Sequence, residues 1–188
     1  MTIDLEKIHI ESSLKYRLMF IAGGIMHICF MILFINIRVM PLVYVNVGSI
    51  LLYLCGVLFC VDKNGHMRYG WIITFYVEIM LHAVLCTLLL GNNVSFHLYA
   101  LVIIPMGIYV LFFSCAVEKF LITFGAFVVG AALMIAGSFI ALDKFAMFPY
   151  FPLTYDETEG IKLLNLVFVA VTLVVFSLLF AVEIYALV

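Results

Sequence analysis

The chain has 188 residues, of which 68% are hydrophobic and 11% are charged. Soluble domains are about 45–50% apolar and about 25% charged, so this composition excludes a water-soluble globular domain and indicates that lipid surrounds part of the chain. The 9 Lys and Arg residues and 11 Asp and Glu residues give a formal net charge of −2, which argues against nucleic acid as a partner.

Charged residues divide the sequence into apolar blocks of about 20 residues, the length that an α-helix needs to cross about 30 Å of hydrocarbon. Strands of a membrane β-barrel would be about half as long and would alternate apolar with polar side chains, which these blocks do not. We therefore predict an all-α fold, a six-transmembrane-helix bundle over residues 17–188. The predicted spans are residues 18–37, 39–61, 69–90, 94–117, 120–142 and 163–187.

Residues 1–16 form the predicted cytoplasmic N-terminal segment, with a weakly amphipathic pattern. Ser12 and Ser13 are candidate caps of the first helix, and Pro41 falls in the first turn of the second, where its missing N–H costs little. Polar turns follow at residues 62–66 and 91–93.

Basic residues predict the orientation. With both termini in the cytoplasm, more of them lie on the inner side than on the outer side, as the positive-inside rule requires. The inner set is Lys7, Lys15, Arg17, Lys63, Arg68 and Lys119, and the outer set is Arg38, Lys144 and Lys162.

No basic anchor follows the last predicted span, and we expect this helix to continue into a cytoplasmic output domain. The five cysteines lie in apolar stretches without a CxxC pair, so neither a disulfide framework nor a zinc site is predicted from them.

Ionisable residues deep in the spans are the candidate functional groups. Glu78 and His82 are four residues apart, on one face of a helix, and Glu78 lies roughly 13–14 Å below Tyr69 at ~1.5 Å per residue. An ionised carboxylate at that depth costs about 3 kcal/mol, so it should face the protein interior, be protonated or be paired.

His27 lies equally deep in the first span. The candidate ligand-binding residues are His27, Asn46, Glu78, His82, His97 and Tyr99. Three interpretations stay open: a hydrogen bond that tightens the bundle, a pocket for a small molecule or lipid, and a haem or metal site formed by His27, Glu78 and His82.

Residues 77–83, with Glu78 and His82, precede Gly91 and the Phe96–Tyr99 segment. Together with His27 in the first span and Asn46, Ser49 and Tyr53 in the second, this pattern resembles the N-terminal six-helix input module of bacterial membrane-bound nucleotide cyclases. Pro105 in the fourth span fits the same pattern. After Gly91 that family has an aromatic residue and a glycine, where this chain has Asn92–Ser95.

The resemblance implies a sensor module of the bacterial plasma membrane, a homodimer, that relays an outer-side or lipid-phase ligand signal to a diguanylate cyclase or a class III adenylyl or guanylyl cyclase. The chain itself is then not an enzyme, and no hydrolase or transferase motif occurs in it. Glu183, near the inner end of the last span, is the expected signal-transmission residue.

Two alternatives use the same residues differently. The first is a haem- or metal-binding membrane redox or sensor protein. The second is a small transporter or channel, which the lack of an internal repeat disfavours.

Overall fold

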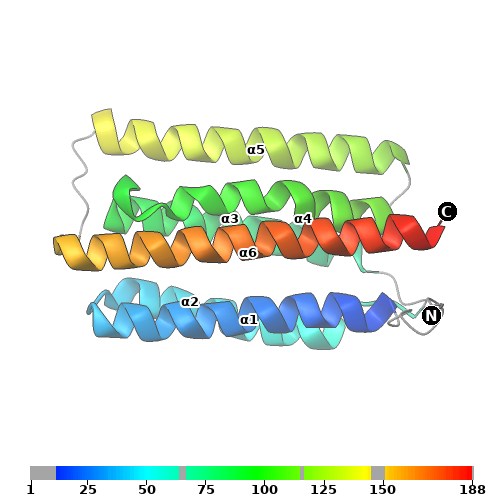
Figure 1. Cartoon of the computed structure of the whole chain (residues 1–188), viewed down its shortest axis with the longest axis horizontal. Helices are drawn as coiled ribbons and strands as arrows, with labels where there is room; N and C mark the ends of the chain where they lie inside the picture. Colours follow the sequence, from blue (N-terminus) through cyan, green and yellow to red (C-terminus); the bar gives the residue numbers. More distant parts are fainter. Residues whose placement is uncertain (1–11, 64–66, 115–116, 145–150, 188) are drawn as a thin grey trace, which may run out of the picture. The chain divides into compact units, whose positions relative to one another are not determined.

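The computed structural model describes residues 12–63, 67–114, 117–144 and 151–187. Within these ranges it contains six α-helices and no strand, which confirms the predicted all-α class. Two short 3₁₀ helices, η2 (Asn92–Val94) and η3 (Phe96–Leu98), lie between α3 and α4 (Figure 1). The α-helices are α1 (Ser12–Asn36), α2 (Met40–Phe59), α3 (Tyr69–Leu90), α4 (Tyr99–Ser114), α5 (Val117–Lys144) and α6 (Tyr155–Leu187).

Five helices of the described part are long and apolar enough to cross a membrane, namely α1, α2, α3, α5 and α6. The apolar helix over Phe96–Phe112 is shorter. Large aliphatic side chains such as Leu58, Ile122, Leu133 and Leu178 are more than half exposed. Such a surface is unfavourable in water and is the surface that a lipid-facing helix presents. By composition, the chain is a membrane protein.

The chain divides into two compact units. The first contains residues 1–73 together with residues 183–188, and the second contains residues 74–182. Helices α3 and α6 therefore each begin in one unit and end in the other. The two units are described in turn.

In the first unit, α1 and α2 lie side by side (Figure 1). The turn between them is closed by Arg38, whose φ of 59° lies in the left-handed region, and by the Val39 N–H, which donates to the Phe34 carbonyl at 2.9 Å. Helices commonly end with a residue in the left-handed region, after which a backbone N–H donates to a carbonyl of the last helical turn. Pro41 occupies the first turn of α2, as predicted.

Glycines allow α1 and α2 to approach closely. A Cβ atom added at Gly23 on α1 would overlap the ring of Tyr53 on α2, and one added at Gly56 on α2 would overlap the ring of Phe20 on α1. Each helix thus has one glycine against which an aromatic side chain of the other helix packs. Small residues at helix contacts are the usual means of close packing between membrane helices.

The start of α3 also packs within the first unit. The Arg17 guanidinium of α1 donates to the Val57 carbonyl near the end of α2 at 3.0 Å. The rings of Phe20 and Trp71 meet edge to face, with centroids 5.6 Å apart. Trp71 belongs to the first turn of α3, so that turn contacts α1 directly.

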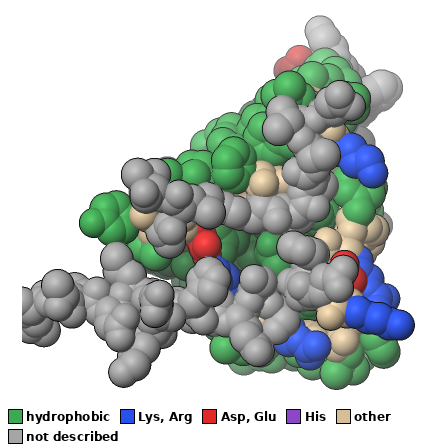
Figure 2. Space-filling view, turned by 90° about the vertical axis from the view of Figure 1, so that its right-hand side faces the viewer, with side chains coloured by type: hydrophobic (Ala, Val, Ile, Leu, Met, Phe, Trp, Pro, Cys, Tyr) green, Lys and Arg blue, Asp and Glu red, His purple; other side chains and the backbone are tan. Residues whose placement is uncertain are grey.

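Four of the five described basic residues of the first unit lie at the start of α1 or in the α2–α3 connection. Figure 2 shows Lys and Arg side chains beside hydrophobic surface on one face of the molecule. Lys15, Arg17, Lys63 and Arg68 belong to the predicted inner set, whereas Arg38, in the turn between α1 and α2, belongs to the predicted outer set.

In the second unit, Tyr76 of α3 anchors α5. Its ring stacks on Phe127 with centroids 3.9 Å apart, and its hydroxyl donates to the Phe127 carbonyl at 2.8 Å. A Cβ atom at Gly130 would lie 2.6 Å from the Tyr76 hydroxyl oxygen. The absence of a side chain at Gly130 thus makes room for the Tyr76 hydroxyl.

A capping box starts α6. The Thr154 N–H donates to the Glu157 carboxylate at 2.8 Å, and the Glu157 N–H donates to the Thr154 hydroxyl at 3.3 Å. These reciprocal bonds satisfy two of the N–H groups that the first turn of a helix leaves without a carbonyl. The helix therefore begins at Tyr155, before the apolar span predicted to start at Leu163.

Candidate functional site

In the first unit, two of the predicted site residues meet. His27 of α1 and Asn46 of α2 are 3% and 0% exposed, and the His27 Nδ1 atom lies 2.9 Å from the Asn46 Oδ1 atom. The Asn46 amide N–H donates to the Leu42 carbonyl, one turn back in α2, at 2.7 Å. Asn46 is thus held by its own helix and presents its oxygen to the imidazole.

This geometry fixes the proton of His27. An amide oxygen only accepts hydrogen bonds, so Nδ1 must carry the proton and donate it to Asn46. In the neutral imidazole, Nε2 then carries the lone pair and acts as an acceptor or a metal ligand. The ring of Tyr53 lies beside His27, with centroids 4.9 Å apart, and so limits the orientation of the imidazole.

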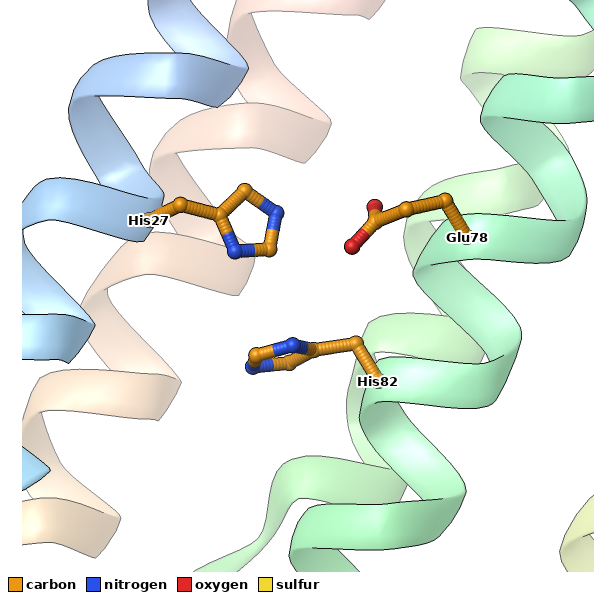
Figure 3. Close-up of side chains that lie close together, drawn as sticks. All are labelled: His27, Glu78 and His82. Atoms are coloured by element: carbon orange, nitrogen blue, oxygen red, sulfur yellow. The ribbon is translucent and has the colours of Figure 1, made fainter. Parts of the chain in front are cut away.

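In the second unit, Glu78 and His82 lie on α3, one turn apart, and are 9% and 7% exposed. Figure 3 shows their side chains leaving successive turns of α3 on the same side of the helix, as the four-residue spacing predicts. The His82 ring lies near Phe96 of η3, with centroids 6.4 Å apart. A carboxylate and an imidazole are therefore presented together by one rigid helix.

Tyr99, another predicted site residue, belongs to a hydrogen-bond chain. Its hydroxyl donates to the Asn165 amide oxygen at 3.4 Å, and the Asn165 amide N–H donates to the Val94 carbonyl at 2.6 Å. Asn165 lies on α6 and is fully buried. Asn165 is not among the predicted site residues, although an asparagine inside the apolar run 163–182 was the signal that could have found it.

His97 lies apart from this chain of bonds. Its ring meets the edge of Phe139 on α5, with centroids 5.1 Å apart. Its Nδ1 atom is buried without a hydrogen-bond partner in the described part of the chain.

A polar cavity of about 420 Å³ lies next to the segment that departs from the family pattern. Its walls are the 92–95 segment and the first turns of α6, with the Lys162–Glu159 ion pair (3.3 Å) among the lining side chains. The backbone here is sharply bent, since Gly91 has a φ of 91° and Ser95 a φ of 66°. Glycine adopts the first conformation without strain.

The predicted transmission residue Glu183 forms an ion pair with Lys15 of α1. Both residues belong to the first unit, and their side chains are 18% and 15% exposed. Partial burial reduces screening by water and salt, so this pair is stronger than a fully exposed one. It joins the start of α1 to the last turns of α6.

Comparison of the chain with protein-family models, with curated proteins and with solved structures finds no match.

His27, Glu78 and His82 each offer one atom that could ligate a metal ion. Four cysteines of the described part, Cys29, Cys55, Cys60 and Cys86, are free thiols.

Proposed function

We propose that the chain is a sensor module of the bacterial plasma membrane. Its six helices cross the membrane with both termini in the cytoplasm, and its last helix relays a ligand signal to a cytoplasmic nucleotide cyclase. The resemblance of residues 27–105 to cyclase input modules supports this proposal. Catalysis then belongs to the output domain, and the chain acts as a homodimer because a cyclase output needs two copies.

One observation carries the proposal: α6 has a polar anchor at each end. Asn165 bonds to the Val94 carbonyl in the second unit, and Glu183 pairs with Lys15 in the first. The two anchors are about 27 Å apart along the helix axis, at ~1.5 Å per residue. A continuous helix held at both ends transmits a displacement of one end to the other.

A ligand shifts such a module only if it binds two packings of the helices with different affinity. The Val94–Tyr99 segment is suited to this role, because it holds the Asn165 contact and lines the polar cavity. A ligand that rearranged the segment would change the position of α6. The change would reach the output domain through the helix that carries Glu183.

The test places the chain upstream of a diguanylate cyclase domain, with α6 continuous into it, and measures cyclic di-GMP in cells. The variants are Glu78→Gln, His82→Gln and Asn165→Leu, with Val171→Leu as the control because Val171 is exposed on α6. We expect the three buried variants to change the nucleotide level about fivefold or more, the size of a typical coupling energy. The control should not change it.

Unchanged cyclic di-GMP in all three buried variants, at equal membrane levels of protein, would contradict the proposal. Detergent extraction followed by size-exclusion chromatography shows whether each variant remains folded.

A further inference from the structure

We propose that the polar cavity beside the 92–95 segment binds a phosphoethanolamine group, a primary ammonium linked to a phosphate, as the headgroup of a phospholipid. The inference deepens the proposed function, on which it rests for its role in signalling, because it names the chemical class of the ligand. The cavity volume of about 420 Å³ is in the range of small-molecule sites. All residues that line the cavity belong to the second unit.

One side of α6 forms a wall of the cavity. The residues of this wall are Tyr155, Thr158, Glu159 and Lys162. Their spacings of three and four residues place them on one face of the helix. The other wall is the 92–95 segment, which contains η2 and the left-handed Ser95. A ligand in the cavity therefore contacts both elements that the proposed signal couples.

Three hydrogen-bond acceptors at the cavity suit a primary ammonium. The Thr158 hydroxyl donates its proton to the Thr154 carbonyl at 2.9 Å, so it can only accept from a ligand. The Glu159 carboxylate is an acceptor as well. The third is the Asn92 Oδ1 atom, which is buried and has no hydrogen-bond partner within the ranges that the structure describes. A primary ammonium has three N–H donors, one for each acceptor.

The buried Asn92 oxygen explains how a ligand would favour a second packing of the 92–95 segment. A buried acceptor that lacks a donor is costly. Because this oxygen is closed to water, an ammonium in the cavity supplies the donor only after the Asn92 side chain turns toward it. The ligand thus binds the rearranged segment more tightly, which is the differential affinity that a population shift needs.

Lys162 supplies the charge that a phosphate needs. Its Nζ atom lies 3.3 Å from the Glu159 Oε1 atom, but the two side chains are 42% and 47% exposed. An ion pair this exposed contributes little stability, so each residue can exchange its partner for a charged group of the ligand. A zwitterion provides both groups: its ammonium binds Glu159 and its phosphate binds Lys162, a residue type that commonly binds phosphate.

The surface next to the cavity indicates a lipid as the source of this group. Lys162 directly precedes the apolar run 163–182, so the cavity lies where headgroups meet hydrocarbon. Leu163 and Val167 follow Glu159 at four-residue spacing and are 64% and 49% exposed. This exposed apolar stripe continues the cavity-lining face of α6. A phospholipid with its headgroup in the cavity places its acyl chains along the stripe.

The first test needs no variant. Native mass spectrometry of the full chain in detergent measures its affinity for phosphatidylethanolamine and for the mono-, di- and trimethylated forms of the same lipid. Each methyl group removes one N–H donor and leaves the charge and the acyl chains unchanged. We expect one phosphatidylethanolamine per chain and at least about tenfold weaker binding of the trimethylated form, phosphatidylcholine, which has no N–H donor.

Variants locate the site on the chain. Glu159→Gln, Lys162→Gln and Asn92→Leu should each weaken binding of phosphatidylethanolamine about fivefold or more. Asp156→Asn is the matched control, because Asp156 is an exposed acid three residues before Glu159 and does not line the cavity. The control should bind the lipid like the parent chain.

Free phosphoethanolamine separates the two sources of the group. If a lipid is the source, the free compound should bind at least about tenfold more weakly than phosphatidylethanolamine, because it makes no contact with the apolar stripe. Equal affinity for the two would overturn the lipid source and assign the cavity to the free headgroup.

Two results would overturn the site itself: equal affinity for phosphatidylethanolamine and phosphatidylcholine, or cavity variants that all bind phosphatidylethanolamine like the parent. These measurements need no output domain. Specific binding of phosphatidylethanolamine together with an unresponsive cyclase fusion would refute the sensor function and leave the lipid site standing.

Discussion

Asn46 in the first unit and Asn165 in the second are both fully buried asparagines on apolar helices, but they make their bonds differently. Asn46 donates to a carbonyl of its own helix and turns its oxygen toward His27. Asn165 donates to the Val94 carbonyl of another element and accepts from Tyr99.

The difference separates two uses of a buried amide. The Asn46 amide N–H donates within its own helix. The bond that Asn46 makes to another helix is therefore the one in which its oxygen accepts from His27 and orients the imidazole. Asn165 uses its donor to bind the segment of two short 3₁₀ helices that precedes α4. We infer that Asn46 serves the chemistry of the site and Asn165 serves the connection between α6 and the 92–99 segment.

The largest effect is expected at Asn165. Asn165→Leu leaves the Val94 carbonyl without its donor, and a buried group left in this state costs about 1–3 kcal/mol. Thermal unfolding in detergent should show the loss, and hydrogen exchange should show faster exchange in residues 92–99. Thr172→Val is the control on the same helix, because the Thr172 hydroxyl bonds only to the Phe168 carbonyl one turn back.

A smaller loss of stability is expected at Asn46. Asn46→Leu leaves one buried group without its partner, the Nδ1–H of His27, whereas the Leu42 carbonyl belongs to an α-helix and keeps its backbone hydrogen bond. The cost should therefore be about 1 kcal/mol, the lower end of the range for such a group, because Asn165→Leu deprives both the Val94 carbonyl and the Tyr99 hydroxyl of a partner. The ¹⁵N NMR signals of the His27 ring should nevertheless change, as Nδ1 loses its acceptor. A stability loss as large as that of Asn165→Leu would remove the distinction between the two asparagines.

The smallest effect is expected at the start of α6. Thr154→Ala removes the hydroxyl that accepts from the Glu157 N–H and donates to the Glu157 carboxylate, and should destabilise the helix start by about 0.5–1 kcal/mol. Thr154→Ser keeps the hydroxyl and should restore most of it. Both values come from chemical or thermal unfolding in detergent, and an alanine variant as stable as the parent would show that the cap is dispensable.

Hydropathy was sufficient to predict the helices, because a bilayer-length apolar block has few other ways to satisfy its backbone. The four-residue spacing likewise predicted that Glu78 and His82 share a face. The α1–α2 packing was not predictable in detail. The roles of Gly23 and Gly56 become visible only when it is known that Tyr53 packs against the first and Phe20 against the second.

Hydrogen-bond and ion-pair partners that are far apart in the sequence were equally unpredictable. The Asn46 contact with His27 and the Asn165 contact with Val94 depend on which helices are neighbours, and one sequence does not contain that information. Glu183 was selected for its position near the inner end of its span. Its pairing with Lys15, at the opposite end of the chain, required the fold.

The central claim is that α6 transmits a signal through its anchored end. A charge-exchange cycle tests it in the cyclase fusion: Lys15→Glu, Glu183→Lys and the double variant. We predict that each single variant changes cyclic di-GMP about fivefold or more, and that the double variant, which restores an ion pair, returns the level to near that of the parent. Single variants without effect, or a double variant no closer to the parent than the worse single variant, would contradict the account.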